Sequence, residues 1–73
     1  MARNDQDRFE QLLARHAGDL EAIIRQYVDD PADRDDLRQE IVVALWRALP
    51  RFRGESSERT YVARIAQNRA VTF

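Results

Sequence analysis

The sequence contains no cysteine and no lysine, and its 73 residues include only two glycines, two prolines and one histidine. Without cysteine there is no disulfide framework and no thiolate metal site. His16 has no second histidine beside it, so we interpret it as a partly buried structural residue and expect no metal or other cofactor. No run approaches the ~18 apolar residues that a membrane span needs. No secretory signal is visible, because the charged start MARNDQDRF lacks an apolar stretch behind it. A cytoplasmic location is the default expectation.

The length suits one small domain. At this size about 60% of the unfolded chain's surface is buried on folding, so stability is marginal and a partner could add to it. The net charge of −1 is unevenly spread. Residues 1–30 hold four arginines against seven acids, residues 31–46 two against four, and residues 47–73 six against two, giving −3, −2 and +4. The C-terminal third is therefore basic and is attached to an acidic body.

Apolar residues recur at intervals of three and four, which predicts helices rather than strands. We expect a first helix from about Gln6 to Val28, with a kink near Gly18. Asp19 could cap the second half of this helix after the kink. Asp30 should end this segment, because a residue before proline disfavours helix. The expected core face of this helix is Phe9, Leu12, Leu13, Leu20, Ile23, Ile24 and Tyr27.

Two further helices complete the predicted fold. The second should run from about Asp33 to Leu49, ending at Pro50, with a core stripe of Leu37, Ile41, Ala44, Leu45 and Ala48. It also carries Val42, Val43 and Trp46 on its other side, so it is either central or in contact with a partner. The third should start near Ser56 or Ser57 as N-cap and run to about Thr72. The prediction is an all-α domain, a small bundle of three main helices.

The basic third interleaves arginines with Phe52 and Tyr61. Such a mixture suits single-stranded nucleic acid, because arginine neutralises phosphate and aromatic rings stack on unpaired bases. The alternative is that late arginines complement the helix dipole while the aromatics belong to the core. A catalytic site is not expected, since no histidine lies near the few hydroxyl side chains. The acidic run DDPADRDD lacks the glycine and spacing of a calcium loop, so helix capping explains it better.

The residues of the last two predicted helices and of the loop between them resemble a known family. The segment DPADRDDLRQEIVVALWRALPRFRGESSERTYVARIAQNRA is similar to region two of the extracytoplasmic-function (ECF) sigma factors of bacterial RNA polymerase. The motifs that carry the resemblance are the aspartate-rich turn, "DL..QE", "LW..LP.FRG.SS.RT" and "RIAQNRA". It covers nearly all of the chain and is tight from Asp30 to Ala70.

The resemblance implies a transcription initiation domain with two working surfaces. One docks on the clamp helices of the largest polymerase subunit, and the other recognises and melts the promoter minus-ten element by capturing a base flipped from the non-template strand. The polymerase-binding positions carried over are Asp36, Gln39, Glu40 and Val43. The DNA-binding positions are Arg51, Phe52, Arg53, Gly54, Glu55 and Ser56 in the loop, and Arg59, Tyr61, Arg64, Asn68 and Arg69 in the last helix. The implied partners are polymerase core, single-stranded promoter DNA and an anti-sigma factor.

Two departures from the family stand out. Family members usually have a large apolar residue at the position of Glu58 and often tryptophan at that of Tyr61. We expect Glu58 on the core-facing side of the last helix. The alternative is that Glu58 caps the start of this helix by pairing with an arginine or with free backbone amides. Family members also carry a region-four domain that reads the minus-thirty-five element. None follows Phe73 here, so we interpret the chain as an excised domain or a natural single-domain variant.

Two rival functions are compatible with the same residues. One is a sigma-like helical protein-interaction module without its own base readout. The other is a duplex-binding helix-turn-helix, for which the seven-residue connection PRFRGES is longer than the usual turn of three or four residues.

Overall fold

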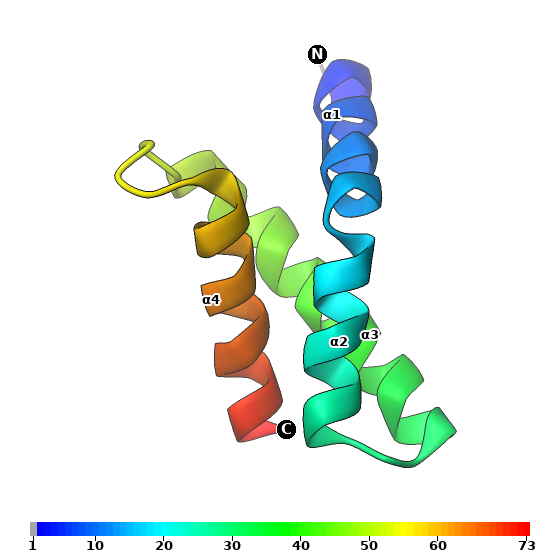
Figure 1. The fold of residues 1–73 in the computed structure, drawn as a ribbon. Coiled ribbons are helices and arrows are strands. Elements are labelled where there is room, and N and C mark those ends of the chain that lie inside the picture. Colours follow the sequence, from blue (N-terminus) through cyan, green and yellow to red (C-terminus); the bar gives the residue numbers. More distant parts are fainter. Residues whose placement is uncertain (1) are drawn as a thin grey trace.

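The computed structural model describes residues 2–73, with side chains from residue 5 onward, and this part of the chain contains helices and no strand. The elements are α1 (Ala2–Arg15), α2 (Ala17–Tyr27), α3 (Pro31–Ala48), the short 3-10 helix η1 (Leu49–Arg51) and α4 (Glu58–Thr72) (Figure 1). The all-α prediction is confirmed. Within residues 2–73, no helix is both long and apolar enough to cross a bilayer.

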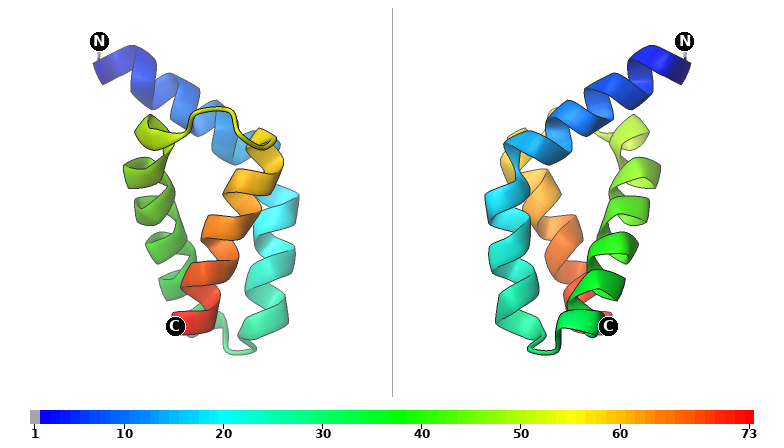
Figure 2. Two further views of the ribbon diagram at one scale, coloured as in Figure 1. Left: turned by 90° about the vertical axis from the view of Figure 1, so that its left-hand side faces the viewer. Right: turned by 90° about the vertical axis from the view of Figure 1, so that its right-hand side faces the viewer.

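Three helices form the body of the domain. α2, α3 and α4 lie around one core, while α1 continues from α2 and extends away from the other helices (Figures 1 and 2). The connection between η1 and α4 lies at the same end as α1, and the C-terminus lies at the opposite end, near the turn between α2 and α3 (Figure 2). The buried apolar residues are Leu12, Leu20, Ile23, Ile24, Leu37, Ile41, Leu45, Val62, Ala66 and Ala70.

The first predicted helix divides at His16 rather than at Gly18. His16 has φ −107° and ψ 10°, outside regular helix, although its amide and carbonyl still hydrogen-bond to Leu12 and Leu20. Its side chain turns into the interior and meets α4, as described below, whereas Gly18 sits within α2 without interruption. Asp19 does not cap the second half, because its carboxylate instead binds Arg59.

α3 begins two residues earlier than the predicted Asp33. Asp30 is its N-cap, with its carboxylate accepting a hydrogen bond of 3.1 Å from the amide of Asp33, and Pro31 occupies the first turn. Proline is well suited there because the first amides of a helix have no intrahelical partner and its φ is already helical. The Asp-Pro pair therefore starts α3, while the preceding helix has already ended at Tyr27.

Ion pairs join α2 to α3 at the surface. Arg38 donates from Nε and Nη2 to the two carboxylate oxygens of Glu21, at 2.6 and 2.7 Å, and from Nη1 to Asp35. The hydrogen bond from Arg38 is the main cause that lowers the pKa of the Glu21 carboxyl. This fork-like contact helps to fix the orientation of α3, the helix that carries the predicted docking residues.

The core of α3 follows the predicted stripe, with Leu37, Ile41 and Leu45 almost completely buried. Ala44 and Ala48 are only partly buried. The prediction that Tyr27 belongs to the core is wrong, because its side chain at the end of α2 is 45% exposed. α3 is central, as its wide apolar surface suggested, and packs against α2, α4 and η1. Trp46 remains 48% exposed but meets the ring of Phe9 edge to face, with centroids 5.0 Å apart.

Candidate nucleic-acid and protein interfaces

The connection between η1 and α4 is an exposed loop shaped by its ends and by one glycine. Gly54 has φ +77°, a left-handed conformation that side chains other than glycine rarely adopt. Arg51, Arg53 and Glu55 are exposed on either side of it, whereas Ser56 is partly buried. The loop therefore presents two guanidinium groups around a backbone turn that glycine makes possible.

Phe52 anchors this loop to α4. Its ring lies against the ring of Tyr61, with centroids 4.5 Å apart and planes inclined by 33°. The Tyr61 hydroxyl in turn donates to the backbone carbonyl of Ala48 at the end of α3, at 3.1 Å. Both aromatic residues are partly buried. Sequence reasoning could not decide whether Phe52 contacts the core or a ligand; in this structure it packs against the protein.

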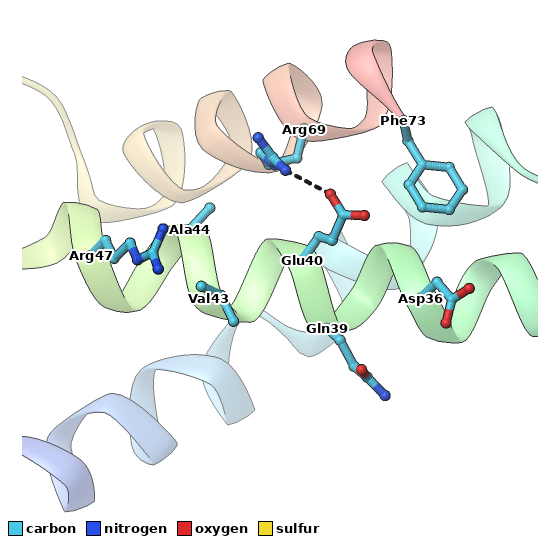
Figure 3. A pocket seen from close by; sticks show the side chains of 8 residues that line it. All are labelled: Asp36, Gln39, Glu40, Val43, Ala44, Arg47, Arg69 and Phe73. Carbon is cyan, nitrogen blue, oxygen red and sulfur yellow. Dashed lines mark hydrogen bonds and ion pairs between the residues drawn. The ribbon is translucent and has the colours of Figure 1, made fainter.

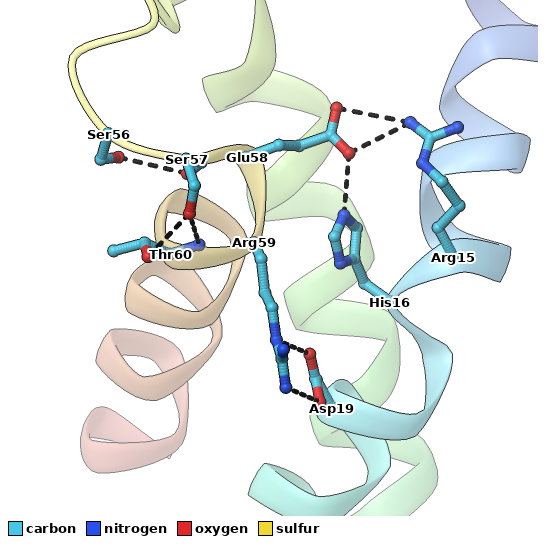
Figure 4. Close-up of polar contacts among 8 residues, drawn as sticks. All are labelled: Arg15, His16, Asp19, Ser56, Ser57, Glu58, Arg59 and Thr60. Carbon is cyan, nitrogen blue, oxygen red and sulfur yellow. Dashed lines mark hydrogen bonds and ion pairs between the residues drawn. The ribbon is translucent and has the colours of Figure 1, made fainter.

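α4 begins with a side-chain cap and an ionic cluster (Figure 4). Ser57, one of the two predicted N-caps, accepts a hydrogen bond of 3.1 Å from the amide of Thr60. The carboxylate of Glu58 is 2.8 Å from Nε2 of the buried His16 and accepts from Nη2 of Arg15 at 3.1 Å. Because an ionised carboxylate only accepts, the proton in the first contact belongs to Nε2. The structural interpretation of His16 is confirmed, and Glu58 pairs with an arginine, as the alternative for this residue predicted.

The cluster also affects the acidity of Glu58. Its pKa lies below the ordinary value of 4.5, chiefly because of the hydrogen bond from His16 and then because of the contact with Arg15, while partial burial opposes this shift. An ionised Glu58 in the first turn also complements the positive end of the helix dipole. The contact thus fixes the start of α4 to the junction of α1 and α2.

Some of the side chains that were predicted to contact DNA are free to do so. Arg64 and Asn68 of α4 are exposed. Within the described residues, no ion pair involves Arg64 or the two arginines before α4, Arg51 and Arg53.

The other two arginines are held by carboxylates. Arg59 donates to Asp19 at 2.7 Å, and Arg69 donates to Glu40 at 2.6 Å. The first pair joins α4 to α2 and the second joins it to α3.

The predicted polymerase-binding residues lie together. A shallow groove of about 600 Å³ runs between α3 and the end of α4 (Figure 3), and Asp36, Gln39, Glu40 and Val43 all line it. Its other lining residues are Ala44, Arg47, Arg69 and Phe73. Sequence reasoning did not include Arg47 or Phe73 in this site. Arg47 could have been found from its helical spacing to Val43 and Glu40, whereas Phe73 is brought to the groove only by the packing of α4 on α3.

A second groove lies between α1 and the end of α3, and sequence reasoning did not anticipate it. It has a volume of about 510 Å³ and is lined by Asp5, Arg8, Phe9, Leu12, Arg15, Trp46, Leu49, Pro50 and Glu58. Its apolar floor is completed by the contact of Phe9 with Trp46. Across the described part of the chain, no group of three or more acidic or histidine side chains is arranged to hold a metal ion.

Comparison with known proteins gives consistent matches over almost the whole chain. The family Sigma-70 region 2 matches residues 12–73. The chain is 34% identical to the RNA polymerase sigma-H factor of Pseudomonas aeruginosa over 68 residues, covering 93% of this chain and 35% of that protein. It is also 34% identical to the ECF RNA polymerase sigma-E factor of Escherichia coli K12 over 71 residues, covering 97% of this chain and 37% of that protein. The chain thus spans about a third of the length of these relatives. No solved structure gives a significant match.

Proposed function

The chain belongs to the Sigma-70 region 2 family, and from this premise we propose that it docks on RNA polymerase core and holds the melted minus-ten element of a promoter. The family comprises non-enzymatic transcription initiation factors. The relatives at 34% identity, from Pseudomonas aeruginosa and Escherichia coli, are named as RNA polymerase sigma factors. Such a factor would work in the cytoplasm with its polymerase, and an anti-sigma factor is a further proposed partner.

The groove of α3 and α4 is the proposed polymerase surface. The observation that carries the proposal is that Asp36, Gln39, Glu40 and Val43, spaced along about two turns of α3, line one continuous groove. Val43 provides an exposed apolar contact, and the carboxylates suit basic residues on a partner helix. Interfaces of this composition, with an apolar centre and charged rim, are typical of specific protein contacts.

The loop and the exposed edge of α4 are the proposed DNA surface. Flipping a base out of the stack costs a few kcal/mol, which the protein must offset by contacts to the base and to the neighbouring phosphates. The backbone around Gly54 can approach a base closely, and the exposed guanidinium groups of Arg51, Arg53 and Arg64 can neutralise phosphate. Because the domain has a net charge of −1, we expect weak binding to DNA until polymerase holds the domain in place.

The test is binding of a labelled non-template minus-ten strand to the complex of this chain with polymerase core. We expect the single strand to bind better than its duplex form. Arg53→Ala should weaken this binding and reduce the dependence on salt, by about 0.7 in the slope of log K against log salt concentration for one lost phosphate contact. Arg25→Ala, which removes an exposed arginine from α2, is the matched control. Equal binding of single strand and duplex would contradict the proposal.

A protein-interaction module without base readout is the second candidate. It is favoured by the packing of Phe52 against Tyr61 and by the ion pairs that hold Arg59 and Arg69, since these groups already have partners within the chain. On this interpretation, Gln39→Ala and Glu40→Ala would abolish promoter opening, while Arg53→Ala would leave it unchanged. Loss of promoter opening with the loop variant, when polymerase binding is intact, would exclude the second candidate.

A further inference from the structure

One ion pair joins the two surfaces proposed above. Nη2 of Arg69, on α4, is 2.6 Å from Oε1 of Glu40, on α3 (Figure 3). Among the described residues it is the only side-chain to side-chain hydrogen bond or ion pair between these two helices. The side chains are 46% and 43% exposed, so an external group can reach either partner. The pair therefore links a residue of the proposed docking groove to a residue carried over as DNA-binding.

In this pair, the carboxylate of Glu40 occupies the guanidinium with which Arg69 would bind phosphate, and the guanidinium occupies the carboxylate with which Glu40 would bind a docking protein. While Glu40 holds the guanidinium of Arg69, the charge of that guanidinium is compensated, which makes it a poorer ligand for phosphate. Conversely, a Glu40 that is already paired offers less to a basic residue of a docking protein. The neighbouring charged groups of the groove, Asp36 and Arg47, form no ion pair within the described residues.

We propose that the Glu40–Arg69 pair couples docking to DNA binding. A cationic group of the docking protein that binds Glu40 displaces Arg69, and the released guanidinium then takes a backbone phosphate of the single strand. This proposal rests on the proposed function. By thermodynamic linkage, DNA phosphate bound by Arg69 must strengthen docking at Glu40 by the same factor. The pair would hold the free domain in a state of low DNA affinity and the docked domain in a state of higher affinity.

The size of the effect follows from the exposure of the pair. Exposed ion pairs contribute little, so we expect release of Arg69 to improve DNA affinity by about two- to fivefold. This corresponds to about 0.4 to 1 kcal/mol, at 1.4 kcal/mol for each tenfold change in affinity. Such a factor is small beside a complete binding interface but is measurable in a direct comparison of variants.

The experiment measures binding of a fluorescent single-stranded minus-ten oligonucleotide to the free domain at low salt. Glu40→Gln should bind two- to fivefold more tightly than Asp36→Asn, which removes the same charge from the same groove without breaking an ion pair. The gain in DNA affinity caused by Glu40→Gln should disappear when Arg69→Ala is also present, because no guanidinium is then left to be released. Circular dichroism establishes that each variant is folded.

The outcomes separate this inference from the function on which it rests. Equal binding of Glu40→Gln and Asp36→Asn, including no binding by either, would overturn the coupling, and so would a gain that persists with Arg69→Ala. Neither result touches the proposed function if the wild-type complex with polymerase still prefers the single strand. A second measurement uses that complex, where Arg69→Ala should weaken DNA binding by a larger factor than it does in the free domain. An equal factor in both would also overturn the coupling.

Discussion

Replacing Glu58 with glutamine would remove one charge from the contact between α4 and the α1–α2 junction at almost constant side-chain size. The glutamine oxygen can still accept from Nε2 of His16, so only the charge-dependent part of that bond is lost. The exposed pair with Arg15 contributes about 0.2 to 0.5 kcal/mol, and a negative charge in the first helical turn about 0.3 to 1 kcal/mol. Together these contributions predict a loss of about 0.5 to 1.5 kcal/mol in the free energy of unfolding.

Urea and thermal denaturation of the wild type and of Glu58→Gln at pH 7 measure this difference in the free energy of unfolding. For a domain of this size, about 1 kcal/mol corresponds to a fall of roughly 4 to 8 °C in Tm. Glu55→Gln is the matched control, because it removes the same charge from the exposed loop. A Glu58→Gln protein as stable as the control would refute the view that the cluster fastens α4 in place.

The pH dependence provides a second check on the same contact. The pKa of Glu58 is lowered in the folded protein, so its contribution is fully present above the ordinary value of 4.5. That contribution is lost as the pH falls from 4.5 through the lower pKa of the folded state, because protonation then costs the wild type its charged contact. The difference in stability between wild type and Glu58→Gln should therefore shrink as the pH falls below 4.5. A difference that grows on acidification would contradict this sign.

Three further substitutions test the construction of the loop, each followed by urea denaturation. Gly54→Ala should lower the free energy of unfolding by about 1 kcal/mol, because alanine is strained at φ +77° although its Cβ meets nothing within 4 Å. Gly54→Asn should lower it by less, since asparagine tolerates this conformation. Equal losses for the two variants would point to a cause other than backbone strain. Ser57→Ala should lose about 1 kcal/mol through the missing cap on the Thr60 amide, whereas Ser57→Asp should retain most of the stability. Tyr61→Phe should lose about 0.5 to 1.5 kcal/mol by leaving the Ala48 carbonyl without its donor, and an unchanged stability would show that water replaces the hydroxyl without cost.

Local sequence signals predicted the parts of the fold that depend on neighbouring residues. Ser57 was one of two candidates for the cap of the last helix because its hydroxyl can reach the amide three residues ahead. Pro50 correctly placed the end of α3 within two residues, although the chain continues as one 3-10 turn. The Asp30–Pro31 pair was interpreted as an end when it is the start of α3, since both roles keep the residue before proline out of helix.

Long-range contacts explain what the sequence could not predict. At the bend, His16 contacts Glu58, which lies 42 residues further along the chain. Gly18 was favoured only because glycine is the usual local cause of a kink. Likewise, the exposure of Tyr27 follows from its place at the end of α2, beyond the reach of the packed helices.

The candidate site shows the same division. The family resemblance gave Asp36, Gln39 and Glu40 as polymerase-binding positions, and the structure places them in one groove. The pair of Glu40 and Arg69 joins residues 29 positions apart, so Arg69 lines the groove although it was predicted to bind DNA, and no spacing rule could indicate this contact.

The projection of α1 away from the body has a consequence for the timescale on which the domain opens. Among its side chains from residue 5 onward, α1 adds only Leu12 to the buried core, with Phe9 and Leu13 packed partly against it. Its backbone amides before Phe9 should therefore exchange with deuterium by local fraying, at a rate set by a small opening free energy. Amides around Ile41 and Leu45 in α3 should exchange only when the whole domain unfolds. The part of α1 before Phe9 would then open and reform many times during the lifetime of one folded domain.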